Sequence, residues 1–194
     1  MATEKKVAQI KSALLRPSLT SKFSVDITSP SILSEFFNST TTEDFNMSCS
    51  EASLPGSSLN TQEITGDRHG VTERNAYRRM YDDRIDLTFY VEGEKYSQIR
   101  YFEQWMNFIV GDDERNVRAS SRYDYKVKYP SEYKTQMRVT KFEKDHGLSL
   151  TYTFIDSYPI AINSMPLSYG SSDLLKCTVS MTYLRYIVED HQGF

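Results

Sequence analysis

Three side chains between Asp67 and Glu73 belong to types that bind divalent metals. Asp67, His69 and Glu73 supply two carboxylates and an imidazole, which are frequent ligands of zinc. His69, however, lies in a turn between two glycines, where polar groups are normally solvated. The sequence also shows no residues that would hydrogen-bond to the three side chains and orient them as metal ligands. We therefore expect a solvated turn here and no metal site.

Other patterns that could support catalysis are also weak. Asp82 and Asp83 could act as an acid–base pair, but they lie among Arg78, Arg79 and Arg84. A charge-complementary contact between subunits is the simpler interpretation. The three histidines are scattered in turns and at the tail, so no serine or cysteine triad can be assembled. No glycine-rich phosphate loop is present, and the sequence predicts neither an enzyme nor a cofactor.

One cluster combines arginines with aromatic rings, a combination that can bind single-stranded nucleic acid: Arg74, Tyr77, Arg78, Arg79 and Tyr81. Acidic residues flank this cluster at Glu73, Asp82 and Asp83, and the whole chain carries a net charge of −3. A patch of mixed charge is a poor footprint for nucleic acid. We favour a contact between protein subunits, and a monomeric β-barrel that binds nucleic acid or a small ligand is the alternative.

The composition is that of one packed domain. The 194 residues are 39% hydrophobic and 25% charged, which supports a core. Fourteen Tyr and ten Phe favour strands. Cys49 and Cys177 lie in alternating apolar patterns, so small buried hydrophobes are the favoured interpretation and a disulfide stays open. No long apolar run follows the N-terminus, and we expect no signal peptide and no membrane anchor.

The residues above must be positioned mainly by strands. Alternation of apolar and polar residues predicts strands at 23–27 and 45–49, and Leu54-Pro55-Gly56 ends the second. The stretch 57–83 is too polar to form a core and too long to be a structureless loop in a compact domain. We expect a projecting β-arm, turned at 66–70 and supported by a neighbouring copy.

The next elements are a strand at 85–91 and a helix from about 96 to 110, which Gly111 ends. One helix face carries Ile99, Phe102, Met106 and Ile109, and a second carries Tyr101, Trp105 and Phe108. A helix that is apolar on two sides is usually covered on two sides. We expect the helix to dock through Ile99, Phe102, Trp105 and Met106.

The C-terminal half predicts further strands at 123–129, 137–139, 148–154 and 175–183. In the strand expected at 148–154, Leu150, Tyr152 and Phe154 would face the core, and Ser149, Thr151 and Thr153 would face solvent. An irregular crossing is expected at 158–160. The total of about six to eight antiparallel strands and one central helix predicts a mainly β (α+β) fold, a small sandwich or barrel.

Ordered short motifs then resemble those of a known family. They are Phe-x-Val-x-Ile at 23–27, Cys-x-x-x-x-Leu-Pro at 49–55, a basic polar hairpin, Asp-x-Thr-x-x-Val at 86–91, an aromatic-x-x-Trp pair at 102–105, Pro-Leu-Ser-Tyr at 166–169 and Val-x-x-x-Tyr at 179–183. Over about residues 21–186, the chain resembles the tail-tube protein family of contractile-tailed bacteriophages. Two departures, the arginine-rich stretch 71–80 and Tyr158–Asn163 in place of Pro-Thr-Asn, favour a specialised ring such as a baseplate-proximal initiator or a terminator.

The resemblance implies a virion structural protein. Its subunits would form stacked homohexameric rings whose sheets join into one ring-wide β-barrel, and phage DNA would pass through the lumen without specific binding. The implied partners are further copies and neighbouring sheath, baseplate or tape-measure proteins. The implied location is the virion tail, with the host cytoplasm during assembly, and the family's simple members need no cofactor.

On this interpretation the chain divides into three parts. Residues 1–20 form an N-terminal arm, whose residues 3–15 can form a short amphipathic helix, with a frayed tail as the alternative. Residues 21–190 form a tail-tube-like β domain that includes the arm at 57–83, and residues 191–194 form a tail. We expect ring contacts at Leu54, Pro55, Arg74, Tyr77, Arg78, Arg79 and Asp83.

Overall fold

The computed structural model describes residues 18–31, 33, 45–66, 70, 72–111, 126–143, 148–170 and 173–192. The helix expected at 3–15, the loop at 112–122, the hairpin turn at 145–147 and most of the loop at 32–44 lie outside these residues. Within the described ranges, no helix is both long and apolar enough to cross a membrane.

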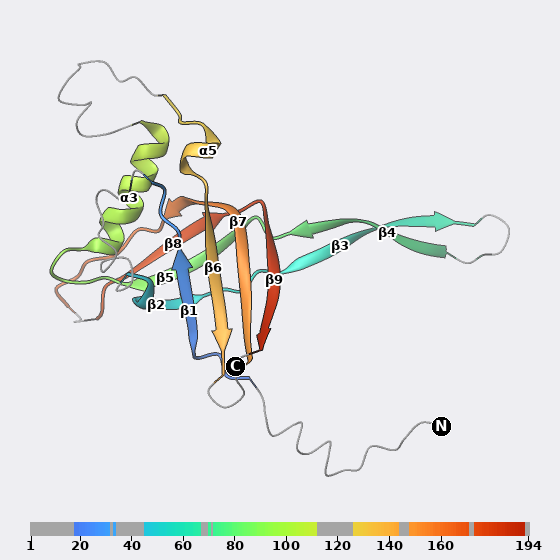
Figure 1. The fold of residues 1–194 in the computed structure, drawn as a ribbon, viewed down its shortest axis with the longest axis horizontal. Helices are drawn as coiled ribbons and strands as arrows, with labels where there is room; N and C mark the ends of the chain where they lie inside the picture. Colours follow the sequence, from blue (N-terminus) through green and yellow to red (C-terminus); the bar gives the residue numbers. More distant parts are fainter. Residues whose placement is uncertain are drawn as a thin grey trace, which may run out of the picture.

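The described chain is mainly antiparallel β with one long helix, which confirms the predicted fold class (Figure 1). The order of elements is β1 (Phe23–Ile27), β2 (Cys49–Ala52), β3 (Ser57–Thr65), β4 (Thr72–Tyr81), β5 (Arg84–Tyr90), α3 (Ser97–Val110), α5 (Pro130–Tyr133), β6 (Thr135–Phe142), β7 (Leu148–Ile162), β8 (Lys176–Thr182) and β9 (Arg185–Gln192). The predicted strands around 23–27, 85–91 and 175–183 are confirmed to within a residue or two.

Seven of these strands form two half-sheets that share β7. The first half-sheet has the order β1-β6-β7-β9, and the second has the order β7-β8-β5-β2. Residues up to Ser157 of β7 pair with β6, and Tyr158–Ile162 pair with β8. The remaining strands, β3 and β4, form a two-stranded sheet of their own.

The expected irregular crossing at 158–160 is instead part of a 15-residue strand. Its irregularity is a bend between the two half-sheets. Asp156 has a left-handed φ of 59°, and the register shifts opposite it between Thr135 and Met137. A second shift lies between Pro159 and Ala161. Bulges of this kind turn a strand and allow it to leave one sheet for another.

The core lies between the half-sheets. In the first, the row Ile27, Met137, Phe154 and Tyr186 is paired in register across all four strands and buried. The second half-sheet contributes Leu87, Phe89, Val179 and Met181 to the same cluster. Because successive side chains of a strand point to opposite faces, the face of the first half-sheet away from the core is polar. Thr151 on that face is only 7% exposed, contrary to the expected wet face, and its hydroxyl is hydrogen-bonded to that of Thr140 at 3.1 Å.

Helix α3 covers one end of this core. Tyr101, Phe102 and Trp105 are buried, and the Trp105 indole N–H donates a hydrogen bond to the Tyr133 carbonyl at 3.1 Å. Gly111 ends the helix with a left-handed φ of 78°, as predicted. Of the four residues expected to dock the helix, Phe102 and Trp105 are buried, Ile99 is half-buried and packed against the core, and Met106 is half-buried. The helix docks through a stripe between the two expected faces, since Phe45 packs against Tyr101 and Phe102.

Three further predictions are wrong. Residues 45–47 form a helical turn, and the strand begins only at Cys49. Residues 126–129, the described part of the strand expected at 123–129, are irregular and lead into α5. Strand β9 was not expected, and it includes residues assigned to the C-terminal tail. Within β9, the adjacent apolar residues Ile187 and Val188 are both exposed. They break the alternation because β9 is an edge strand.

Candidate assembly surfaces

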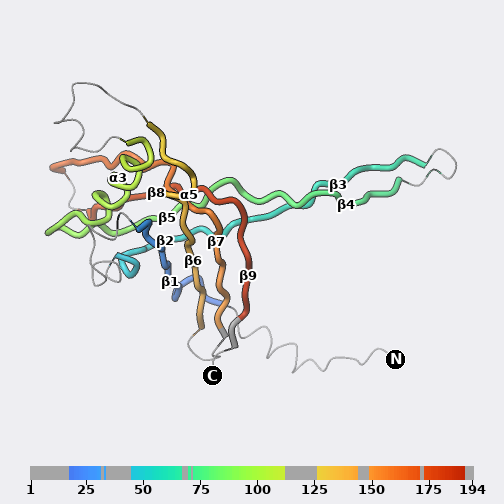
Figure 2. The backbone as a smooth tube through the Cα atoms, turned by 45° about the horizontal axis from the view of Figure 1, so that its top comes forward, coloured from blue at the N-terminus to red at the C-terminus, as the bar shows by residue number. Residues whose placement is uncertain are grey.

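The expected arm at 57–83 is a long β-hairpin that projects from the body (Figures 1 and 2). Its strands β3 and β4 are exposed along almost their whole length. Large apolar side chains are exposed on it, including Leu59 at 62% and Tyr77 at 65%. An isolated two-stranded sheet in water is only marginally stable, so this arm has the properties of an element that packs on another chain.

The register of the hairpin sorts its side chains onto two faces. Leu59 lies opposite Arg79, and Glu63 lies opposite Arg74 with an ion pair of 2.8 Å. On the other face, Arg78 lies opposite Asn60, and Met80 lies opposite Ser58. Between Asn60 and Thr61 the register shifts and leaves Tyr77 as an extra residue. Such a bulge increases the local twist, and the extra residue here is a strongly exposed aromatic.

Contacts with the main body hold the base of the arm. The Arg79 guanidinium lies 4.9 Å from the Tyr81 ring centroid and 5.5 Å from that of Tyr186 on β9. It also donates hydrogen bonds to the Ser57 hydroxyl at 3.1 Å and the Tyr186 hydroxyl at 3.4 Å. The two tyrosine rings meet edge to face at 5.2 Å. Arg79 therefore has an intramolecular role at the arm base.

Asp82 and Asp83 lie at the same base. The Asp82 carboxylate accepts a hydrogen bond from the Gly56 backbone N–H, and the Asp83 carbonyl accepts one from the Thr182 hydroxyl at 2.7 Å. Burial raises the pKa of the nearby Tyr183 to about 12, and Asp82, Tyr186 and Asp83 contribute in the same direction. The hydrogen bond between Gly56 and Asp82 therefore closes the base of the arm. Among the described residues, neither Asp82 nor Asp83 forms an ion pair.

The remaining residues expected at ring contacts are spread along the arm and its base. Leu54 is exposed and Pro55 half-buried in the segment that leads into β3, while Arg74, Tyr77 and Arg78 are exposed on β4. Leu59, Ile64 and Met80 are also exposed on the arm, although the sequence pattern did not predict a role for them. Their signal was weak, because single apolar residues in a polar stretch show no periodicity.

The first half-sheet has two open edges. Among the described strands, β1 pairs only with β6 and β9 pairs only with β7. All pairs in this half-sheet are antiparallel, so across its four strands β1 and β9 run in opposite directions. Free edges are templates for pairing with another chain. The β9 edge of one copy and the β1 edge of another would form an antiparallel pair.

The polar face of this half-sheet carries few charges. Its paired rows contain Ser24, Thr140, Thr151 and Glu189, then Asp26, Arg138, Thr153 and Ile187, and then Ile155 opposite Arg185. Hydroxyl groups dominate, and the two carboxylates are balanced by two guanidiniums. Such a face binds water and offers no basic stripe for a phosphate backbone.

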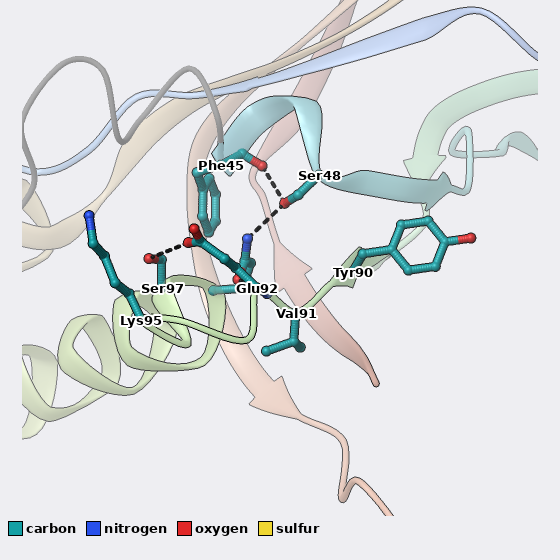
Figure 3. Close-up of a pocket in the computed structure, with 8 residues that line it drawn as sticks. Phe45, Ser48, Tyr90, Val91, Glu92, Lys95 and Ser97 are labelled. Carbon is teal, nitrogen blue, oxygen red and sulfur yellow. Dashed lines mark hydrogen bonds between the residues drawn. The ribbon is translucent and has the colours of Figure 1, made fainter. Parts of the chain in front are cut away.

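A pocket of about 280 Å³ lies beside the start of α3 and includes Glu92, Lys95, Ser97 and Gln98 (Figure 3). The Gln98 amide accepts a hydrogen bond from the Glu92 backbone N–H and donates one to the Ser48 hydroxyl, each at 3.1 Å. Ser97 donates to the Glu92 carboxylate at 3.3 Å. These bonds join the 45–48 turn to the helix, which is a structural use of the polar groups.

The two cysteines are free. Both pair in register with Phe89, from opposite sides, because Cys49 is on β2 and Cys177 is on β8. Two strand spacings, about 9–10 Å, separate them, which is beyond the reach of a disulfide. Burial raises the pKa of Cys49 to about 12 and that of Cys177 to about 11.

The metal hypothesis at Asp67, His69 and Glu73 falls partly outside the described residues, because Asp67 and His69 are not among them. Within the part of the chain that the structure describes, no group of three His, Cys, Asp or Glu side chains is placed to hold a metal ion.

Comparison of the sequence with models of known protein families identifies one matching family. A family model described as phage tail tube protein matches residues 18–189. No curated protein sequence matches the chain.

Similar solved structures come from contractile injection systems. The chain matches a chain of the anti-feeding prophage tube terminating cap, with 13% identity, 91% of this chain and 93% of that chain covered, and a TM-score of 0.59. It also matches chains of two extracellular contractile injection system structures, the PVC sheath/tube terminator (15% identity, 90% and 97% covered, TM-score 0.55) and the PVC sheath-tube complex (16%, 96% and 99%, TM-score 0.51), both in the extended state. At these identities the likeness concerns the fold.

Proposed function

The chain belongs to the phage tail tube protein family, and from this membership we propose that it forms a closed ring by joining its first half-sheet to that of the next copy. As a member of the family it is a structural component of a tail tube. The ring is the assembly that the open edges and the exposed arm support best.

The observation that carries this proposal is the opposite direction of the two edge strands. Because the half-sheet has four antiparallel strands, β9 of one copy continues into β1 of the next without changing the antiparallel order. Each new copy restores the same pair of edges. Closure of such a series into a barrel removes both free edges of the first half-sheet, and rotational symmetry then limits lateral growth.

Family resemblance supplies the size and setting of the ring. We infer homohexamers that stack through their different upper and lower surfaces, in a virion tail assembled in the host cytoplasm. Sheath, baseplate or tape-measure proteins are the inferred neighbours. The polar face of the half-sheet would line the lumen, where hydroxyls and balanced charges, with no basic stripe, would let phage DNA slide without specific binding. No step of this function requires catalysis or a cofactor.

A second candidate is a terminal ring of the same fold, either a baseplate-proximal initiator or a terminator. The arginine-rich arm favours this specialised position, since a terminal ring contacts a different protein on one side. The two candidates differ in whether copies of this chain stack on one another.

Light scattering after size-exclusion chromatography, followed by negative-stain microscopy of the full chain, tests the proposal. Rings that stack into long tubes indicate a tube subunit, and rings that remain single indicate a terminal ring. A protein that stays monomeric at high concentration would overturn both.

A further inference from the structure

We propose that, within the ring, the arm of each copy docks on the loop end of the adjacent copy. The loop end consists of the turn before α3 (residues 91–96) and the described parts of the β7–β8 loop (residues 163–170 and 173–175). This inference rests on the proposed ring and adds the surface that receives the arm.

The arm and the loop end lie at opposite ends of the molecule. Figures 1 and 2 both show the arm extending past β9, whereas the turn before α3 and the β7–β8 loop extend beyond the β1 side. When β9 of one copy meets β1 of the next, the first copy's arm crosses the junction toward the second copy's loop end. The contact would be head-to-tail, as a closed ring requires.

The reach of the arm fits this arrangement. Strand β4 has ten residues, which span about 33 Å at roughly 3.3 Å per residue. Four strands at a spacing of about 4.8 Å occupy roughly 19 Å. The arm is therefore longer than the half-sheet is wide, and it extends well into the adjacent copy.

The loop end exposes apolar side chains that match those on the arm. Leu167 is 85% exposed and Leu174 is 76% exposed, and the Tyr169 side chain is completely exposed. The two segments are connected, because the Val91 N–H donates a hydrogen bond to the Leu175 carbonyl at 3.0 Å. Grouped exposed apolar residues mark interaction surfaces, and Leu59 and Tyr77 on the arm are of similar chemistry.

Charge favours the same pairing. The described loop end contains three acids, Glu92, Glu94 and Asp173, and one cation, Lys95, which gives a net charge of −2. The arm strands β3 and β4 contain three arginines and two glutamates, Glu63 and Glu73, which gives a net charge of +1. Of the arginines, Arg74 is paired with Glu63 and Arg79 is held at the base. The described residues offer no partner to the Arg78 side chain, which is exposed. Opposite charges on two meeting surfaces select the correct partner and orientation.

Photo-crosslinking of the assembled full-length chain tests the docking. The arm carries Tyr77→p-benzoylphenylalanine, and the assembly mixes this variant with isotopically heavy chains that lack the crosslinker. Mass spectrometry then identifies crosslinked peptides that join a light chain to a heavy chain. We expect the heavy peptide to come from residues 91–96 or 163–175. The same crosslinker at Tyr129, which is exposed near α5, is the control and should not reach these peptides.

Rings whose Tyr77 crosslinks fall elsewhere, or only within one chain, overturn the docking and leave the proposed ring standing. Failure of the unmodified chain to assemble overturns both. A second variant covers the case in which the crosslinker itself prevents assembly. Leu167→Ser/Leu174→Ser should reduce the assembled fraction at least fivefold, while Val127→Ser, at another exposed site, should not. Normal assembly of the double variant counts against the docking.

Discussion

The Arg79 guanidinium donates a hydrogen bond to the Tyr186 hydroxyl at 3.4 Å and lies 5.5 Å from the centre of its ring. Arg79 is on the arm and Tyr186 is on the edge strand β9. The arm is thus attached to the strand whose free edge is proposed to meet the next copy. Displacement of the arm, or of the free edge of β9, would therefore disturb the same junction between two copies.

Arg79→Gln should loosen the arm base without unfolding the body. The change removes cation–π contacts and hydrogen bonds that together contribute about 1 kcal/mol locally. Amide hydrogen exchange in 57–60 and 78–81 should accelerate about fivefold, while the β6–β7 pair should be unchanged. Arg78→Gln is the matched control because Arg78 is exposed on the other face. Equal acceleration in both variants would contradict the assigned role of Arg79.

Arg78→Glu should reduce assembly while leaving the monomer folded. The exposed side chain has no intramolecular partner among the described residues, so the substitution should change the free energy of unfolding by less than about 0.5 kcal/mol. Repulsion at a subunit contact should lower the assembled fraction severalfold. Arg100→Glu, an equal charge change on the exposed side of α3, is the control. Sedimentation velocity and circular dichroism measure the two effects, and normal assembly would remove Arg78 from the contact.

Gly111→Ala should destabilise the fold by about 1–2 kcal/mol. The residue has a φ of 78°, and an added Cβ would lie 3.0 Å from the Lys126 carbonyl oxygen. Gly93→Ala is the comparison, because an added Cβ at Gly93 meets nothing within 4 Å and its φ is not left-handed. Urea denaturation followed by Trp105 fluorescence measures both. Equal midpoints would show that the helix end tolerates a side chain.

Glu143 should titrate well below an ordinary glutamate. A hydrogen bond from Lys141 at 2.7 Å, and then one from Ser18, lower the pKa of Glu143 from 4.5 to about 2. Because the folded pKa is the lower one, the stabilisation is complete above about pH 4.5 and is lost as the pH falls through about 2. Carboxyl NMR should show this pKa, and Lys141→Gln should raise it. An unchanged value in the variant would exclude the lysine as its main cause.

The two thiols should be unreactive in the folded chain. Because burial raises the pKa of Cys49 to about 12 and that of Cys177 to about 11, almost no thiolate exists at pH 8. An aromatic disulfide reagent should modify both thiols only after unfolding in guanidinium, at the rate of a small free thiol. Rapid reaction of one equivalent with the folded protein would contradict the burial of that cysteine.

Part of the fold follows from short-range patterns. The alternation in 23–27, 85–91 and 175–183 predicts strands because one face of each is buried and the other is polar. The helix at 97–110 could be predicted equally well, since its apolar residues recur at the helical period and Gly111 provides a left-handed residue that ends it. The arm was predicted from what it lacks, because a long polar stretch cannot support a core.

The rest depends on contacts between distant residues. Local periodicity places Ile99 and Trp105 on apolar faces, but only the docking of the helix decides that Trp105 is buried and Ile99 half-buried. Trp105 there packs on Tyr101 and donates a hydrogen bond to the Tyr133 carbonyl. Edge strand β9 shows no alternation, because solvent on one side lets apolar and charged residues mix. Arg78 and Arg79 are adjacent and chemically identical in the sequence. Their different environments arise only because β4 alternates its faces and β9 brings Tyr186 to one of them.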